Sequence, residues 1–169
     1  MEEQNPYRSP NAAIAEPAGE ELASRWVRLG AAFIDGIIML VILLPIMYFG
    51  GYWQAATTAA AAGQQVGLGT TLLWAAVGFI VFLVVQGVPL NATAQTWGKR
   101  ITGIKIVDLA GNKPPLGKLI GLRYLPVGVA SNIPFIGPII SLVNVLLIFR
   151  ADRRCGHDLI AGTRVVKAG

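Results

Sequence analysis

The chain has 169 residues, of which 54% are hydrophobic and only 14% are charged. This charged share is well below the roughly 25% of soluble domains, so the composition predicts an integral membrane protein with room for one small helical bundle. The net charge of +5 is typical of membrane-protein loops that face anionic lipid. We therefore expect the lipid bilayer, and not a nucleic acid, as a partner.

The first 23 residues contain three prolines and five acids but few side chains that a core could bury. This composition predicts a disordered cytoplasmic tail over residues 1–23, followed by one membrane domain over residues 24–169. Within the tail, residues 5–10 (NPYRSP) are either a short recognition peptide for a protein partner or part of a plain solvated segment.

Residues 25–49 form the first predicted transmembrane helix, because an apolar run of about 20 residues can cross a bilayer. Asp35 is the only charged residue between positions 29 and 49. A carboxylate at the centre of such a helix costs roughly 2.5–3.5 kcal/mol on insertion scales. Arg28 lies about two turns earlier on the same face. Asp35 is therefore a candidate cation or proton site, whereas Arg28 either belongs to that site or only marks the cytoplasmic end of the helix.

The second predicted transmembrane helix covers residues 70–91, after an uncharged outer loop over residues 50–69. Its inner end carries Gln86 and Asn91 at the depth expected for Asp35. These two residues either supply hydrogen-bond partners to Asp35 or belong to an ordinary frayed helix end.

Lysine and arginine are absent between positions 29 and 98 and then occur six times in residues 99–123. The positive-inside rule therefore predicts a multi-pass protein with both termini in the cytoplasm. A single crossing by residues 116–149 would place the basic C-terminus outside. The break SNIPFIGP instead predicts two short helices, 116–131 and 136–149, that enter and leave from the cytoplasmic side. Arg123 would lie in the first arm, and Asn132 could satisfy backbone groups at the break.

Two segments have the pattern of short strands, residues 101–108 and residues 162–167. A lone strand leaves its backbone groups unpaired, so we expect the two segments to form a small cytoplasmic β-ribbon. The predicted fold class is therefore an all-α membrane protein with two transmembrane helices, a broken membrane-embedded helical pair and this ribbon.

Three motifs in this order resemble the RDD family of bacterial membrane proteins, which is named for one arginine and two aspartates. They are Arg28 and Asp35 in the first helix, the segment TWGKRITGIKIV at residues 96–107, and HDLIAGTRVV at residues 157–166, which contains Asp158. The resemblance covers about residues 24–167. It implies location in the bacterial cytoplasmic membrane and, for some members, transport such as sodium/proton exchange.

Asp158 can pair with Arg28 or Arg123 at the inner interface, which leaves Asp35 to bind a cation or exchange a proton. His157 either titrates near neutral pH or caps a turn. Cys155 is either a reactive thiol next to arginines or a passive cysteine. The sequence contains no phosphate-binding loop, no metal-ligand cluster and no nucleophile–base spacing, so we expect no enzyme activity, cofactor or metal.

Two functions follow from these residues. The first is transport of a monovalent cation or proton through a site around Asp35. Four membrane segments are few for a transporter, which favours either a homo-oligomer or a non-transporting scaffold. The second is a non-transporting scaffold or accessory subunit, in which the arginines and aspartates form a structural clamp.

Overall fold

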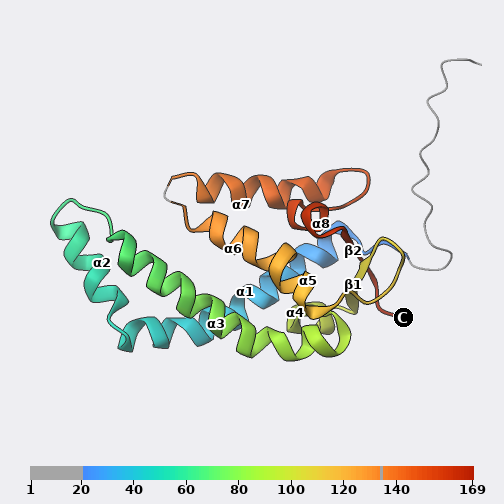
Figure 1. Ribbon diagram of the computed structural model, residues 1–169, viewed down its shortest axis with the longest axis horizontal. Helices are drawn as coiled ribbons and strands as arrows, with labels where there is room; N and C mark the ends of the chain where they lie inside the picture. Colours follow the sequence, from blue (N-terminus) through green and yellow to red (C-terminus); the bar gives the residue numbers. More distant parts are fainter. Residues whose placement is uncertain (1–20, 134) are drawn as a thin grey trace, which may run out of the picture.

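The computed structural model describes residues 21–133 and 135–169, so residues 1–20 of the predicted tail over residues 1–23 lie outside the described residues. The described chain is mostly helical and contains one small two-stranded sheet (Figure 1). Its elements, in chain order, are α1 (Arg25–Phe49), α2 (Tyr52–Ala61), α3 (Leu68–Thr93), α4 (Trp97–Ile101), β1 (Ile104–Asp108), α5 (Leu116–Lys118), the π-helix η1 (Leu119–Tyr124), α6 (Leu125–Ser131), α7 (Gly137–Leu146), the 3₁₀ turn η2 (Leu147–Phe149), α8 (Gly156–Ala161) and β2 (Thr163–Lys167).

Helices α1 and α3 are long and apolar enough to cross a membrane, which confirms that the two predicted segments form long apolar helices. Ser24 caps the start of α1 by accepting a hydrogen bond from the backbone nitrogen of Val27 at 3.2 Å. The connection between the spans is not simply a loop, because α2 forms within it. The sequence of α2 is rich in alanine, which has high helix propensity. The prediction of an outer loop over residues 50–69 did not take this propensity into account.

The predicted break in the C-terminal pair is confirmed. Helix α6 ends at Ser131 and α7 begins at Gly137. Ser131 Oγ donates to the carbonyl of Val127 and Asn132 Nδ2 to the carbonyl of Gly128, each at 2.7 Å. The side chains at the break therefore add hydrogen bonds to carbonyl groups near the C-terminal end of α6.

The predicted ribbon is also confirmed: β1 and β2 pair antiparallel, with Ile106 opposite Val165. It starts later than residue 101, which ends α4, and later than Gly162, which caps α8 with a positive φ of 57°. Residues 21–23, which the sequence analysis assigned to the tail, join the ribbon. Leu22 bridges to Val166, and the backbone nitrogen of Ala23 donates to Val165 O at 3.0 Å.

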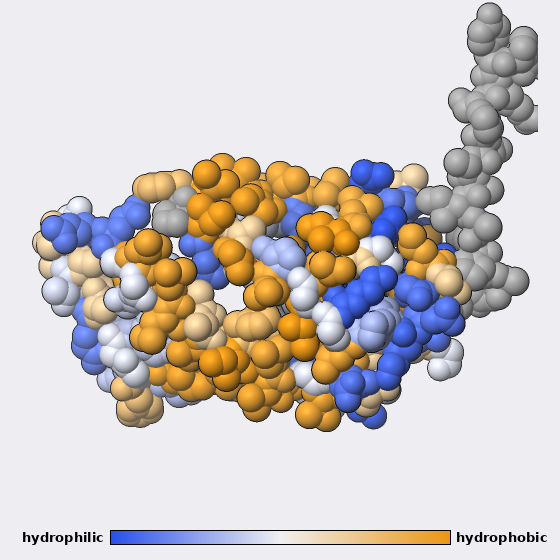
Figure 2. Space-filling view, in the orientation of Figure 1, coloured by the Kyte–Doolittle hydropathy of each residue, from blue (hydrophilic) through white to orange (hydrophobic). Residues whose placement is uncertain are grey.

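The buried apolar core lies at the ribbon end of the molecule. One face of the ribbon packs against residues of α1, α3 and η1, namely Ala31, Leu90 and Leu119. The start of α1 and the C-terminus lie at this same end (Figure 1). Away from it, large apolar side chains of α1 and α3 are exposed. Figure 2 shows the result as a broad hydrophobic surface across the middle of the molecule, with hydrophilic residues around the ribbon end and also at the opposite end.

Candidate functional site

Asp158 is the centre of a buried charge cluster at the ribbon end. Its side chain is fully buried and accepts hydrogen bonds from two guanidinium groups, that of Arg28 at 2.5 Å and that of Arg123. The backbone nitrogen of Cys155 and the hydroxyl of Thr163 also donate to it, at 3.1 and 3.2 Å. Asp158 was predicted to pair with Arg28 or Arg123, and it pairs with both. The cluster joins α1, η1 and α8.

Arg123 reaches Asp158 from the π-helix η1. π-Helical turns are rare and occur frequently at functional sites. Arg123 is only 1% exposed, and its Nη1 also donates to Thr163 Oγ1 at 2.6 Å. Its Nε and the hydroxyl of Tyr124 are buried, and neither has a hydrogen-bond partner among the described residues. The guanidinium carbon lies 5.8 Å from the centre of the Tyr124 ring, so part of the charge rests near an aromatic side chain.

Burial alone would raise the pKa of Asp158, but the charges of Arg123 and Arg28 outweigh burial and hold this pKa well below its usual range. The pKa of His157 is also lowered, to about 3, by burial and by the nearby Arg123, but for a histidine this favours the neutral form. The imidazole is therefore neutral at pH 7. Of the two predicted alternatives, titration near neutral pH is wrong. His157 instead holds α7, because both its backbone nitrogen and Nδ1 lie 3.0 Å from Asn144 Oδ1.

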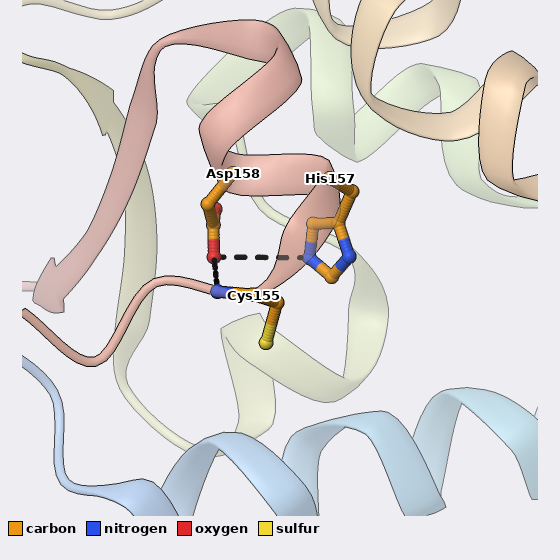
Figure 3. A group of neighbouring side chains, drawn as sticks. All are labelled: Cys155, His157 and Asp158. Atoms are coloured by element: carbon orange, nitrogen blue, oxygen red, sulfur yellow. Dashed lines mark hydrogen bonds and ion pairs between the residues drawn. The ribbon is translucent and has the colours of Figure 1, made fainter. Parts of the chain in front are cut away.

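Cys155, His157 and Asp158 form a group whose potential ligand atoms lie within 4.8 Å of one another (Figure 3). Thiolate, imidazole and carboxylate groups this close together could in principle bind a metal ion. Both oxygens of Asp158 already accept guanidinium hydrogen bonds, and two arginines beside the group repel a cation. Burial raises the pKa of the Cys155 thiol, although Arg28 opposes this effect, so the thiolate ligand is disfavoured. The group does not fit a metal site, and Cys155 matches the passive alternative.

Asp35 lies in a second, separate cluster between α1, α3 and α4. Its carboxylate accepts from the backbone nitrogen of Gly98 at 2.7 Å, from Gln86 Nε2 at 3.0 Å and from the hydroxyl of Thr96. The first turn of a helix carries unpaired N–H groups and a partial positive charge, so the carboxylate caps α4 from another helix. Lys99 Nζ lies 3.8 Å from Asp35, and the two side chains are 14% and 17% exposed.

Gly98 makes this contact possible. A Cβ at this position would overlap the carbonyl oxygen of Ala31 and approach Asp35 Cγ to 2.9 Å. Only glycine lets α4 come this close to α1. The sequence motif TWGKR therefore builds the polar surroundings of Asp35.

A model of the RDD family matches residues 22–162. The chain belongs to the RDD family. Similar proteins include YckC of Bacillus subtilis, 35% identical over 156 residues, which cover 92% of this chain and 87% of YckC. An uncharacterized protein of Haemophilus influenzae is 30% identical over 90% of this chain and 82% of its own length. YxaI of Bacillus subtilis is 30% identical over 87% of this chain and 98% of its own length. No solved structure matches the chain.

The arginine and the two aspartates that resemble the RDD motif, Arg28, Asp35 and Asp158, thus separate into two clusters. Arg28 and Asp158 pair with each other, while Asp35 has neither Arg28 nor Arg123 as a partner. Of the predicted supporting residues, Gln86 contacts Asp35. Asn91 is exposed, and only its backbone carbonyl accepts a hydrogen bond, from Lys113.

Asn132 satisfies the end of α6 and makes no hydrogen bond to Asp35. Sequence reasoning missed Thr96, Gly98 and Lys99 as neighbours of Asp35. The signal was present in the RDD motif TWGKR, but the motif served only for recognition of the family.

Proposed function

We propose that this RDD protein is a small integral membrane protein of the bacterial cytoplasmic membrane, with both termini in the cytoplasm. The support is the pair of long apolar helices together with the exposed apolar side chains between the polar regions. Phe33 in α1 and Val84 in α3, for example, are 70% and 71% exposed. Apolar surface on this scale is unfavourable in water and suits lipid contact. The clustering of arginines and lysines at the ribbon end supports a cytoplasmic location for that end.

Within the membrane, we propose that the protein transports a monovalent cation or proton through a site around Asp35. The observation that carries this proposal is the contrast between the two aspartates. Asp158 is locked by two buried arginines, whereas Asp35 faces one partly exposed lysine at 3.8 Å. The Lys99 ammonium occupies the position that an incoming cation would take. Displacement of this ammonium by a cation is the proposed exchange step, because neither side chain is fully buried.

The Arg28–Asp158–Arg123 cluster has a structural role in this proposal. Its charges are buried and paired with one another, and His157 beside it is neutral at pH 7. The cluster links α1, which carries Asp35, to η1 and α8 and so holds these elements in place relative to one another. A small chain with few membrane segments would complete a transport path most readily as a homo-oligomer.

The second candidate function is a non-transporting scaffold or accessory subunit. The observation in its favour is that Asp35 also satisfies three donors as a cap for α4. A carboxylate with only this role would need no ion. The two functions make opposite predictions for variants that keep the cap but remove the charge.

The test is ion flux in proteoliposomes that contain the purified protein. Asp35→Asn should fold and abolish cation-linked flux, while Asp152→Asn, which removes an aspartate of the more exposed Arg150 pair, should retain it. Flux that is equal in wild type and Asp35→Asn would reject the transport site. Absence of flux in every sample, including wild type, would favour the scaffold.

A further inference from the structure

The broken helical pair encloses a groove that neither cluster uses. Its volume is about 440 Å³, and it runs between α6 and α7, with α8 at one end. The lining is almost entirely apolar, with Pro126 and Ala130 from α6, Ile139 and Val143 from α7, and Ile160 from α8. A volume between about 300 and 1,000 Å³ is typical of small-molecule sites. Apolar side chains along its edge are strongly exposed, Ile139 by 61% and Ile160 by 55%.

We propose that this groove binds an acyl chain of an anionic phospholipid. This inference rests on the membrane location proposed above but not on transport. In Figure 2, hydrophobic residues cover the surface over α6 and α7 and continue into the broad apolar surface of the molecule. An apolar groove that opens on such a surface is accessible to a lipid tail from the side.

The polar groups near the groove lie at its α8 end, where a lipid headgroup region would be. Asn144 lines the groove there, and its Oδ1 is used by His157. Its Nδ2 has no hydrogen-bond partner among residues 21–133 and 135–169. This amide is a donor that an ester carbonyl of a lipid can accept from.

Two cations near the same end give the site a preference for negative charge. Lys118 Nζ lies 3.8 Å from the position that a Cβ of Gly162 would occupy, directly after α8, and has no acidic partner in the described part of the chain. Arg150 directly follows η2; its side chain is 53% exposed and lies 3.3 Å from Asp152. Each unpaired basic residue near a membrane surface favours anionic over neutral lipid by about fivefold. An anionic headgroup would therefore complement Lys118 and compete with Asp152 for Arg150, while its tail fills the groove.

The experiment measures lipid retained by the full-length protein in detergent, using native mass spectrometry. Delipidated protein is offered equimolar phosphatidylglycerol and phosphatidylcholine. Wild type should retain phosphatidylglycerol preferentially, by at least about fivefold, which is the effect of one unpaired cation. Ala130→Phe should fill the groove and abolish this retention, while Ala76→Phe, on an exposed position of α3, should not. The double variant Lys118→Gln with Arg150→Gln should lose the preference but still bind both lipids.

The thermal midpoint of each variant shows whether it is folded. Folded Ala130→Phe protein that retains as much phosphatidylglycerol as wild type would overturn the proposal. The proposal also fails if folded wild type shows no lipid preference, or if the groove instead holds a second copy, seen as a dimer that Ala130→Phe dissociates without any lipid. If Ala130→Phe does not fold, Val143→Phe serves as the groove-filling variant, with the same two outcomes. A protein that is recovered from cells outside the membrane fraction would reject the membrane location itself, which distinguishes the two failures.

Discussion

The substitution Asp158→Asn tests the buried clamp. It removes the charge that pairs with Arg28 and Arg123 while keeping the shape of the side chain. Removal of one partner of a buried ion pair costs about 3–5 kcal/mol, because the remaining charge is left unpaired. Here two guanidinium groups lose their partner, so we expect a loss in the upper part of this range, about 4–5 kcal/mol. For a chain of this size, each kcal/mol lowers the thermal midpoint by about 2–4 °C, which predicts a decrease of about 8–20 °C.

Second substitutions should then recover part of the loss. Adding Arg28→Gln to Asp158→Asn removes one unpaired charge, and adding Arg123→Gln removes the other. Arg123 is 1% exposed and Arg28 is 8% exposed, so the double variant with Arg123→Gln should recover more. Thermal unfolding in detergent provides the measurement. Glu21→Gln is the control, because Glu21 and Lys167 form an exposed pair, with side chains 71% and 58% exposed, and exposed pairs contribute about 0–1 kcal/mol. A midpoint for Asp158→Asn within about 2 °C of wild type would refute the reasoning, as would double variants no more stable than the single one.

Three further predictions concern other parts of the molecule. The low pKa of His157 means that the unfolded chain, with a histidine pKa near 6.5, binds a proton before the folded chain does. The free energy of unfolding should therefore fall as the pH decreases from about 6.5 to 3. Between pH 7.5 and 4.5, the thermal midpoint of His157→Gln should fall less than that of the wild type. An identical fall in the two proteins would contradict this. Gly98→Ala should lower stability by about 1–3 kcal/mol in thermal unfolding, because its Cβ overlaps Ala31 O, whereas an unchanged midpoint would show that α4 can move away freely. Deletion of residues 1–20 should leave a folded protein that is monodisperse by size-exclusion chromatography. Deletion of residues 1–24 should not, because residues 21–23 pair with β2. Equal behaviour of the two truncated proteins would count against this pairing.

The sequence predicted those features whose signals are local. The two candidate spans follow from long apolar runs, and the break near Pro138 follows from adjacent helix-breaking residues. The ribbon was predictable because the described chain offers two strand-like segments, each of which needs a partner. Their register was not, because it depends on how β1 and β2 meet in space.

The surroundings of the aspartates were only partly predictable. Asp35 contacts Thr96 and Gly98, which are more than 60 positions away in the sequence, through a helix too short to show a periodic pattern. The π-helical turn that carries Arg123 has no simple sequence signal. The neutral state of His157 depends on burial and on the approach of Arg123, neither of which a sequence reveals.

The most direct test of the role of Asp35 compares Asp35→Asn with Asp35→Glu in the same flux assay. Asparagine is nearly equal to aspartate as a helix cap, so a capping role is better served by the isosteric Asn than by the longer Glu. An ion site needs the charge, which only Glu retains. At equal amounts of folded protein, measurable flux through Asp35→Glu and none through Asp35→Asn is the predicted result. Flux through Asp35→Asn that equals or exceeds that of Asp35→Glu would contradict transport at this carboxylate.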